Sequence, residues 1–127
     1  MFDRRVLDQH RTVEELQASW RREVCVYYPM LSADVVRGYS DRVTDAAKRL
    51  SVSSPLQFEL VLAFFFRATI QKIRTGTAPE VAIRNLPKDV NEMGLLVIET
   101  NINPVTGETL TDKDLRRANR LGKLKLQ

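Results

Sequence analysis

The stretch from Ser54 to Gly76 constrains the fold of this chain more than any other part of its sequence. Ser54 can cap the N-terminus of a helix, Pro55 suits the first helical position, and Gln57 completes a reciprocal capping pattern. Gly76 favours the left-handed conformation that often ends a helix. These signals predict a helix over residues 55–75, which corresponds to about five to six turns.

Apolar side chains cover more than half of the circumference of this predicted helix, since successive residues are offset by about 100°. The apolar residues are Phe58, Val61, Leu62, Phe64, Phe65, Phe66, Ala68 and Ile73. A narrow stripe remains, made of Glu59, Ala63, Arg67, Gln71 and Arg74. A helix with so wide an apolar surface has to be enclosed, so we expect it at the centre of the hydrophobic core.

Two more helices are predicted before the central one. Thr12 and Glu15 form a capping-box pattern, and apolar residues then recur at steps of three and four until Pro29. These residues are Val13, Leu16, Trp20, Val24 and Tyr27. Ser32 caps the second helix, which a linker over residues 51–53 joins to the central helix. Its expected inward face consists of Val35, Val36, Tyr39, Val43, Ala46, Ala47 and Leu50.

The outer face of the second helix carries acids and arginines interleaved at helical spacing. They are Asp34, Arg37, Asp41, Arg42, Asp45 and Arg49. Oppositely charged residues three or four apart on a helix can pair, with a gain of about 0.2 to 0.5 kcal/mol each. We interpret this series as a solvated face with ion pairs rather than as a catalytic group of carboxylates.

The chain after the central helix predicts shorter elements. A helix capped by Thr77 should run from Pro79 to Leu86, because Pro87 cannot continue it. One further helical turn is expected over Lys88 to Met93, with Gly94 as its end.

The period of the sequence then changes. Residues 95–100 (Leu-Leu-Val-Ile-Glu-Thr) are rich in β-formers, and residues 103–108 are dense in turn residues. Thr109 and Leu110 can return as a short second strand. The sequence therefore predicts one β-hairpin over residues 95–110.

The predicted fold class is mainly α, a compact bundle of about five helices around the central helix with one β-hairpin near the C-terminus. A chain of 127 residues suits a single domain. Residues 1–11 are expected to form a mobile arm without a secretory leader, and residues 111–127 a basic helix and tail. The longest uninterrupted apolar run, Leu60 to Phe66, has seven residues. We expect no membrane span, because about 20 residues are needed to cross a bilayer.

Positive charge is concentrated at the end of the chain. Residues 113–127 contain six Lys and Arg against one acid, Asp114, so this segment carries +5 while residues 1–112 carry −1. Thr111 can cap a helix here. Four cations then fall within about 100° of one another on that helix, and two more follow it: Lys113, Arg116, Arg117 and Arg120, then Lys123 and Lys125.

These six cations are the candidate nucleic-acid-binding residues. Arginines suit phosphate contacts because the guanidinium offers several donors and a permanent charge. The alternative is a solvated helix end whose cations complement the helix dipole. The adjacent Tyr27 and Tyr28 could stack on bases. We expect instead that one of them belongs to the core and the other to its edge.

The sequence offers little for catalysis or for holding a metal ion. His10 and Cys25 are its only histidine and cysteine, and the five glycines are scattered singly rather than clustered as in phosphate-binding loops. A Cys25 nucleophile with His10 as base is conceivable. We expect instead a buried Cys25 and a solvated His10, with no enzyme activity, metal or cofactor. A single cysteine also favours a reducing, cytoplasmic setting.

The sequence thus predicts a non-enzymatic nucleic-acid-binding or regulatory accessory protein that contacts the phosphates of DNA or RNA through its C-terminal basic helix. The alternative is a helical protein-interaction module, such as an adaptor, a chaperone or an assembly component, that docks an acidic protein partner. In both cases we expect self-association as a homo-oligomer.

Overall fold

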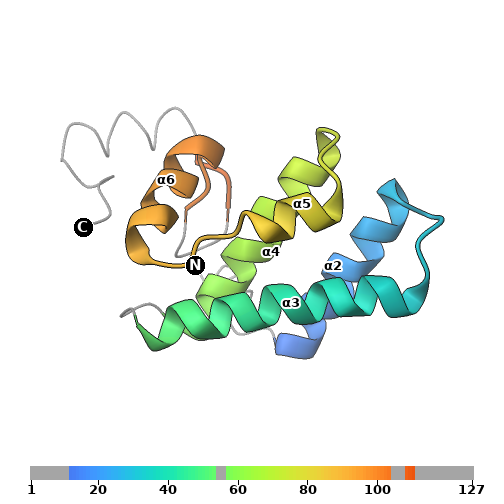
Figure 1. Cartoon of the computed structure of the whole chain (residues 1–127), viewed down its shortest axis with the longest axis horizontal. Coiled ribbons are helices and arrows are strands. Elements are labelled where there is room, and N and C mark those ends of the chain that lie inside the picture. The colour runs from blue at the N-terminus through green and yellow to red at the C-terminus, as the bar shows by residue number, and fades with distance from the viewer. Residues whose placement is uncertain (1–11, 54–56, 104–107, 111–127) are drawn as a thin grey trace, which may run out of the picture.

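The computed structural model describes residues 12–53, 57–103 and 108–110, and this part of the chain is mainly helical (Figure 1). Its helices are α2 (Val13–Tyr27), α3 (Ala33–Val52), α4 (Phe58–Arg74), α5 (Pro79–Arg84) and α6 (Val90–Thr100). Helices α2, α3 and α4 contact one another, and α5 contacts both α3 and α4. Helix α6 lies at the opposite end of the molecule from α2 (Figure 1).

The first two helices begin where the sequence predicts. The Thr12 hydroxyl accepts a hydrogen bond from the Glu15 amide at 3.1 Å, and the Glu15 carboxylate accepts one from the Thr12 amide at 2.9 Å. The Ser32 hydroxyl caps α3 by accepting from the Val35 amide at 3.2 Å. Helix α3 runs on through Val52, so the linker predicted at residues 51–53 is largely its last turn.

The central helix α4 ends as predicted but begins later. Gly76 has a φ of +106°, and its amide donates to the Ile73 carbonyl at 3.1 Å. The Thr77 amide donates to the Lys72 carbonyl at 3.0 Å, which completes a Schellman motif. At the other end, Gln57 has extended backbone angles and is itself the N-cap. The predicted third-position role of Gln57 is therefore wrong, and Ser54 and Pro55 lie outside the described residues.

Helix α4 is enclosed by the other helices, which confirms its predicted central position. Its buried residues are Val61, Leu62, Phe64, Phe65, Phe66, Ala68, Thr69, Ile70 and Ile73. The stripe predicted to be polar is exposed or half-buried. Thr69 is the polar exception, and its hydroxyl accepts a hydrogen bond from the indole nitrogen of Trp20 at 3.0 Å. The Trp20 ring also packs on Phe66, with 5.3 Å between the ring centroids.

The predicted β-hairpin is wrong in its first strand, because residues 95–100 belong to α6. Asp89 caps this helix by accepting from the Glu92 amide at 2.8 Å, and the helix passes through Gly94 without ending. It stops at Asn101, which adopts the left-handed conformation with a φ of 57°. Buried residues recur along it at helical spacing, namely Met93, Leu96, Val97 and Thr100.

The C-terminal half of the predicted hairpin is reduced to one isolated β-bridge and the backbone hydrogen bonds beside it. Within the described residues there is no β-strand, and Ile102 and Thr109 form an isolated antiparallel bridge. The Asn103 amide donates to the Glu108 carbonyl at 2.8 Å. The chain therefore reverses direction here without forming a ladder. Residues 104–107 of the predicted turn lie outside the described residues.

Two smaller corrections concern α5 and the faces of α2 and α3. The N-cap of α5 is Ala78 rather than Thr77, no side chain caps the helix, and it ends at Arg84 instead of Leu86. Tyr27 and Val35, predicted to face inward, are 43% and 41% exposed, and both lie beside the turn between α2 and α3.

Replacement of Phe65 by alanine should lower the free energy of unfolding by about 3 to 5 kcal/mol, since the side chain is fully buried in α4 and its loss leaves a cavity. Chemical denaturation of the purified protein measures this loss. The half-buried Phe58 on the same helix is the matched control, and Phe58→Ala should cost less. A loss below about 1 kcal/mol for Phe65→Ala would contradict the enclosure of α4.

Replacement of Gly38 by alanine should raise the free energy of unfolding by about 1 kcal/mol, because glycine weakens a helix interior. A Cβ atom added at this position in α3 meets no heavy atom within 4 Å. Gly76→Ala is the control, and should lower stability by about 1 to 2 kcal/mol because of its positive φ. Thermal melts of both variants test this pair, and shifts of the same sign would show that α3 or the α4 terminus is wrongly assigned.

Candidate functional site

The six cations predicted to contact phosphates lie outside the described residues. They are Lys113, Arg116, Arg117, Arg120, Lys123 and Lys125. Their arrangement on one face of a helix therefore stays a prediction. So does the mobile arm over residues 1–11, which includes His10.

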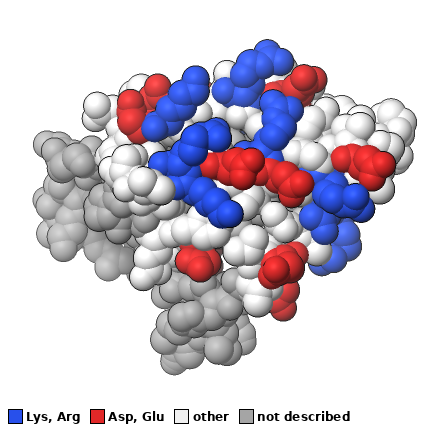
Figure 2. All heavy atoms as spheres, turned by 60° about the horizontal axis from the view of Figure 1, so that its bottom comes forward, with Lys and Arg blue, Asp and Glu red and all other residues white. Residues whose placement is uncertain are grey.

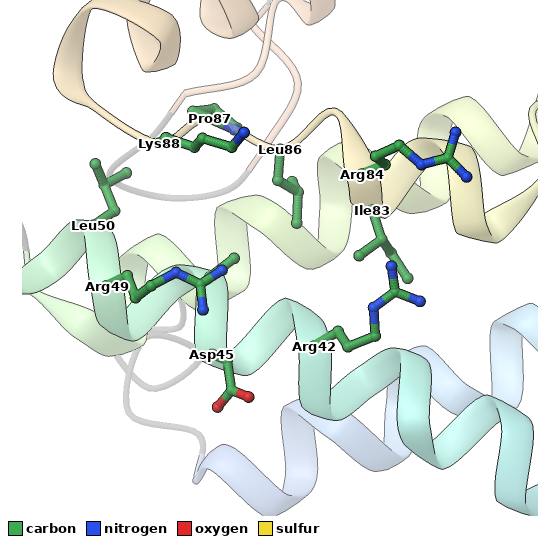
Figure 3. Close-up of a pocket in the computed structure, with 10 residues that line it drawn as sticks. Arg42, Asp45, Arg49, Leu50, Ile83, Arg84, Leu86, Pro87 and Lys88 are labelled. Carbon is green, nitrogen blue, oxygen red and sulfur yellow. The ribbon is translucent and has the colours of Figure 1, made fainter.

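A different group of cations surrounds a cavity in the described part of the chain. The cavity has a volume of about 570 Å³ and lies between α3 on one side and the end of α5 with the segment that follows it on the other (Figure 3). Its lining residues are Arg42, Asp45, Ala46, Arg49 and Leu50 from α3, and Ile83, Arg84, Leu86, Pro87 and Lys88 from the other wall. We refer to this site as the cationic cleft.

Local structure explains how the two walls are built. Arg42, Asp45 and Arg49 are spaced by three and four residues, which places them along one side of α3. On the other wall, Pro87 follows the end of α5 and cannot continue it. The chain from residue 85 to residue 89 therefore leaves the helix and passes along α3 before α6 begins (Figure 3).

The floor of the cationic cleft is apolar. Leu50, Ile83, Leu86 and Pro87 are all buried, and the Leu86 side chain points towards α3 in Figure 3. Burial of these side chains anchors both walls to the hydrophobic core. The charged side chains of the cleft are exposed above this floor.

The charge of the cleft differs from that of the rest of the described chain. The described residues carry eleven Lys and Arg against twelve Asp and Glu, whereas the cleft has four cations and one acid. Asp45, the one acid, points away from the opposite wall (Figure 3). The wider face that carries α3 mixes both signs of charge (Figure 2). The cleft is thus a local concentration of positive charge on a balanced surface.

No hydrogen bond or ion pair is formed by the charged groups of Arg42, Arg49, Arg84 or Lys88 in the described structure. The ion-pair face predicted for α3 is confirmed as an exposed face, but its one ion pair among the described residues joins Arg37 to Asp34, at 3.2 Å. The four cleft cations therefore keep their full hydrogen-bonding capacity for a ligand.

Two cations of α4 contrast with those of the cleft because they join helices. Lys72 pairs with Glu99 of α6 at 3.1 Å, and Arg74 pairs with Glu23 of α2. The hydrogen bond with Glu23 raises the pKa of the Arg74 guanidinium above its ordinary value. Both pairs are partly exposed, so each adds at most about 1 kcal/mol to stability.

The cysteine and tyrosines that the sequence singled out do not form a site. Cys25 is exposed, so its predicted burial is wrong, and His10 lies outside the described residues. Tyr28 is half-buried against the core and its hydroxyl donates to the Thr77 carbonyl at 3.4 Å. Tyr27 is the more exposed of the two, so the expected division between core and edge holds with Tyr28 as the inner residue.

The described residues contain neither a metal site nor a membrane-spanning helix. No group of three or more His, Cys, Asp or Glu side chains there is arranged to hold a metal ion. No helix in the same ranges combines the length and apolarity needed to cross a bilayer. No protein-family model, curated protein or solved structure matches this chain, so the candidate sites rest on its own residues.

Sequence reasoning missed the cleft because its walls come from segments about forty residues apart in the chain. On α3, Asp45 is three residues from Arg42 and four from Arg49, a spacing that favours ion pairing but does not produce it here. The signal that was available is the pair Arg84 and Lys88 on either side of Pro87, one at the end of α5 and the other in the segment that follows it.

Proposed function

We propose that this protein is a non-enzymatic nucleic-acid-binding or regulatory accessory protein of the cytoplasm, and that it contacts the phosphates of DNA or RNA through residues 111–127. The distribution of charge carries this proposal. The described body is nearly neutral, while residues 113–127 hold six of the twenty Lys and Arg of the chain against one acid. Electrostatic attraction to a polyanion therefore originates mainly in this segment.

The spacing of these cations supports phosphate contacts. Lys113, Arg116, Arg117 and Arg120 fall at i, i+3, i+4 and i+7, which would align them on one side of a helix. Contacts of this kind position a protein on a nucleic acid without reading its sequence. We therefore expect binding with little dependence on base sequence and strong dependence on salt.

A second candidate function, a protein-interaction module that self-associates or docks an acidic protein, is favoured by a different observation. Large apolar side chains are exposed around the turn between α2 and α3, with Val26 72% and Met30 78% accessible. Tyr27 and Val35 extend this apolar surface. Contiguous exposed apolar surface often marks a protein-binding site.

Replacement of Arg116, Arg117 and Arg120 by alanine should abolish retention on immobilised DNA and RNA with almost no change in melting temperature. For the unmodified protein, the affinity for duplex DNA should fall with a log-log salt slope of about −5 if six phosphates are neutralised. Fluorescence anisotropy at several salt concentrations measures the affinity of each protein and its salt slope, and thermal melts give the melting temperatures.

The control variant removes three exposed cations of the body that lie outside the cationic cleft, by replacing Arg22, Lys48 and Arg67 with alanine. This control has the same net charge as the variant without Arg116, Arg117 and Arg120, which we call the tail variant. The control should keep most of the binding to DNA and RNA. Unchanged binding in the tail variant would refute phosphate contact through residues 111–127. A stable dimer in size-exclusion chromatography, with no binding to DNA or RNA, would support the interaction module instead.

A further inference from the structure

We propose that the cationic cleft is a binding site for a small organic molecule that carries two or more phosphate groups. This site is separate from the segment proposed to contact nucleic acid, and its ligand would be an effector of the protein. The cavity volume of about 570 Å³ lies within the range of about 300 to 1,000 Å³ that is typical of small-molecule sites.

The positions of the cations require a ligand with more than one anionic group. Arg42 and Arg49 are seven residues apart on α3, so their Cα atoms are separated by about 10 Å along the helix axis. Arg84 and Lys88 belong to the opposite wall (Figure 3). A single phosphate is too small to contact all four side chains. Two or more linked phosphates can lie between the walls and receive donors from each.

The chemistry of the side chains favours phosphate. Three of the four cations are arginines, whose planar guanidinium groups donate paired hydrogen bonds to phosphate oxygens. The donors of Arg42, Arg49, Arg84 and Lys88 are not engaged by a carboxylate, since these side chains have no ion-pair partner in the described structure. Four cations and the one acid, Asp45, leave about three net positive charges, which match the charge of a polyphosphate better than that of a monoanion.

The apolar floor indicates that the ligand has an organic part. Leu50, Ile83, Leu86 and Pro87 offer aliphatic surface beneath the charged rim. Among the described residues that line the cleft there is no aromatic side chain, whereas proteins that bind single-stranded nucleic acid commonly stack bases on aromatic rings. A small phosphorylated molecule therefore fits the cleft better than a nucleic-acid strand does.

Isothermal titration calorimetry of the full chain tests this site, with ATP, inorganic tripolyphosphate and inorganic phosphate as probes. The protein carries Arg116→Ala, Arg117→Ala and Arg120→Ala, so that these arginines do not contribute. ATP and tripolyphosphate should each bind with one-to-one stoichiometry, and inorganic phosphate at least about tenfold more weakly, because it reaches fewer donors. ATP should bind more tightly than tripolyphosphate because of the apolar floor.

Variants of each wall locate the binding. Arg42→Ala with Arg49→Ala removes one wall, and Arg84→Ala with Lys88→Ala removes the other. Each pair should weaken the binding of ATP by at least about tenfold. Arg22→Ala with Arg67→Ala, which removes the same charge outside the cleft, should change it less than about twofold. Arg49→Lys keeps the charge but loses the paired donors, and should give an intermediate affinity.

Three outcomes would overturn the proposal: no binding of ATP or tripolyphosphate at millimolar concentration, equal weakening by the wall variants and the control, or tighter binding of a polyglutamate peptide than of ATP. Melting temperatures of the variants verify folding, which the exposure of all four side chains should leave intact. The two proposals are separated by measuring DNA binding of cleft variants in which residues 111–127 are unchanged. These variants should lose ATP binding but still bind DNA, because the two ligands use different residues.

Discussion

The enclosure of α4 is the constraint on which the rest of the described fold depends. Fully buried aromatic side chains such as Phe64 and Phe65 lie on different sides of this helix, so a single neighbouring helix cannot cover it. Helices α2 and α3 cover most of it, the short α5 adds to this cover, and Lys72 joins α4 to Glu99 of α6. Because Pro87 follows so soon after α5, residues 85–89 do not continue this helix, and they lie beside α3. The cationic cleft occupies this region, so its existence follows from the way α4 is covered.

Polar groups between the helices define how they are oriented. Burial of apolar surface is non-directional, whereas a hydrogen bond fixes two atoms relative to each other. Trp20 reaches Thr69 across the contact of α2 with α4. Gln17 donates to the Thr44 hydroxyl at 2.9 Å, and Arg21 to the Ser40 hydroxyl, so α2 and α3 are joined in the same manner. These bonds hold α3 in a defined rotation, which in turn decides which of its arginines face the cleft.

Local signals made much of the helical fold predictable from the sequence, and their limits explain the errors. The start of α2 at Thr12 and the end of α4 at Gly76 depend on a few adjacent residues, so the sequence predicts both correctly. Residues 95–100 suit either a strand or a buried helix, because a short apolar run has no decisive period. Packing of Met93 and Leu96 in the core decided for the helix. The cleft was beyond sequence reasoning because it joins residues that only the tertiary fold brings together.

Stability does not explain the cations of the cleft. Two like charges about 10 Å apart repel by about 0.4 kcal/mol in water, and salt weakens this further, so the fold tolerates the cluster but gains nothing from it. Elsewhere on the same helix Arg37 has a carboxylate partner, and on α4 Lys72 and Arg74 join neighbouring helices. The cleft cations make no such contacts in the described structure, although Asp45 is within reach along the helix. A group that is electrostatically unfavourable in the isolated protein becomes favourable when an anion lies between its members, and this reversal is the physical basis for assigning the cleft to a ligand.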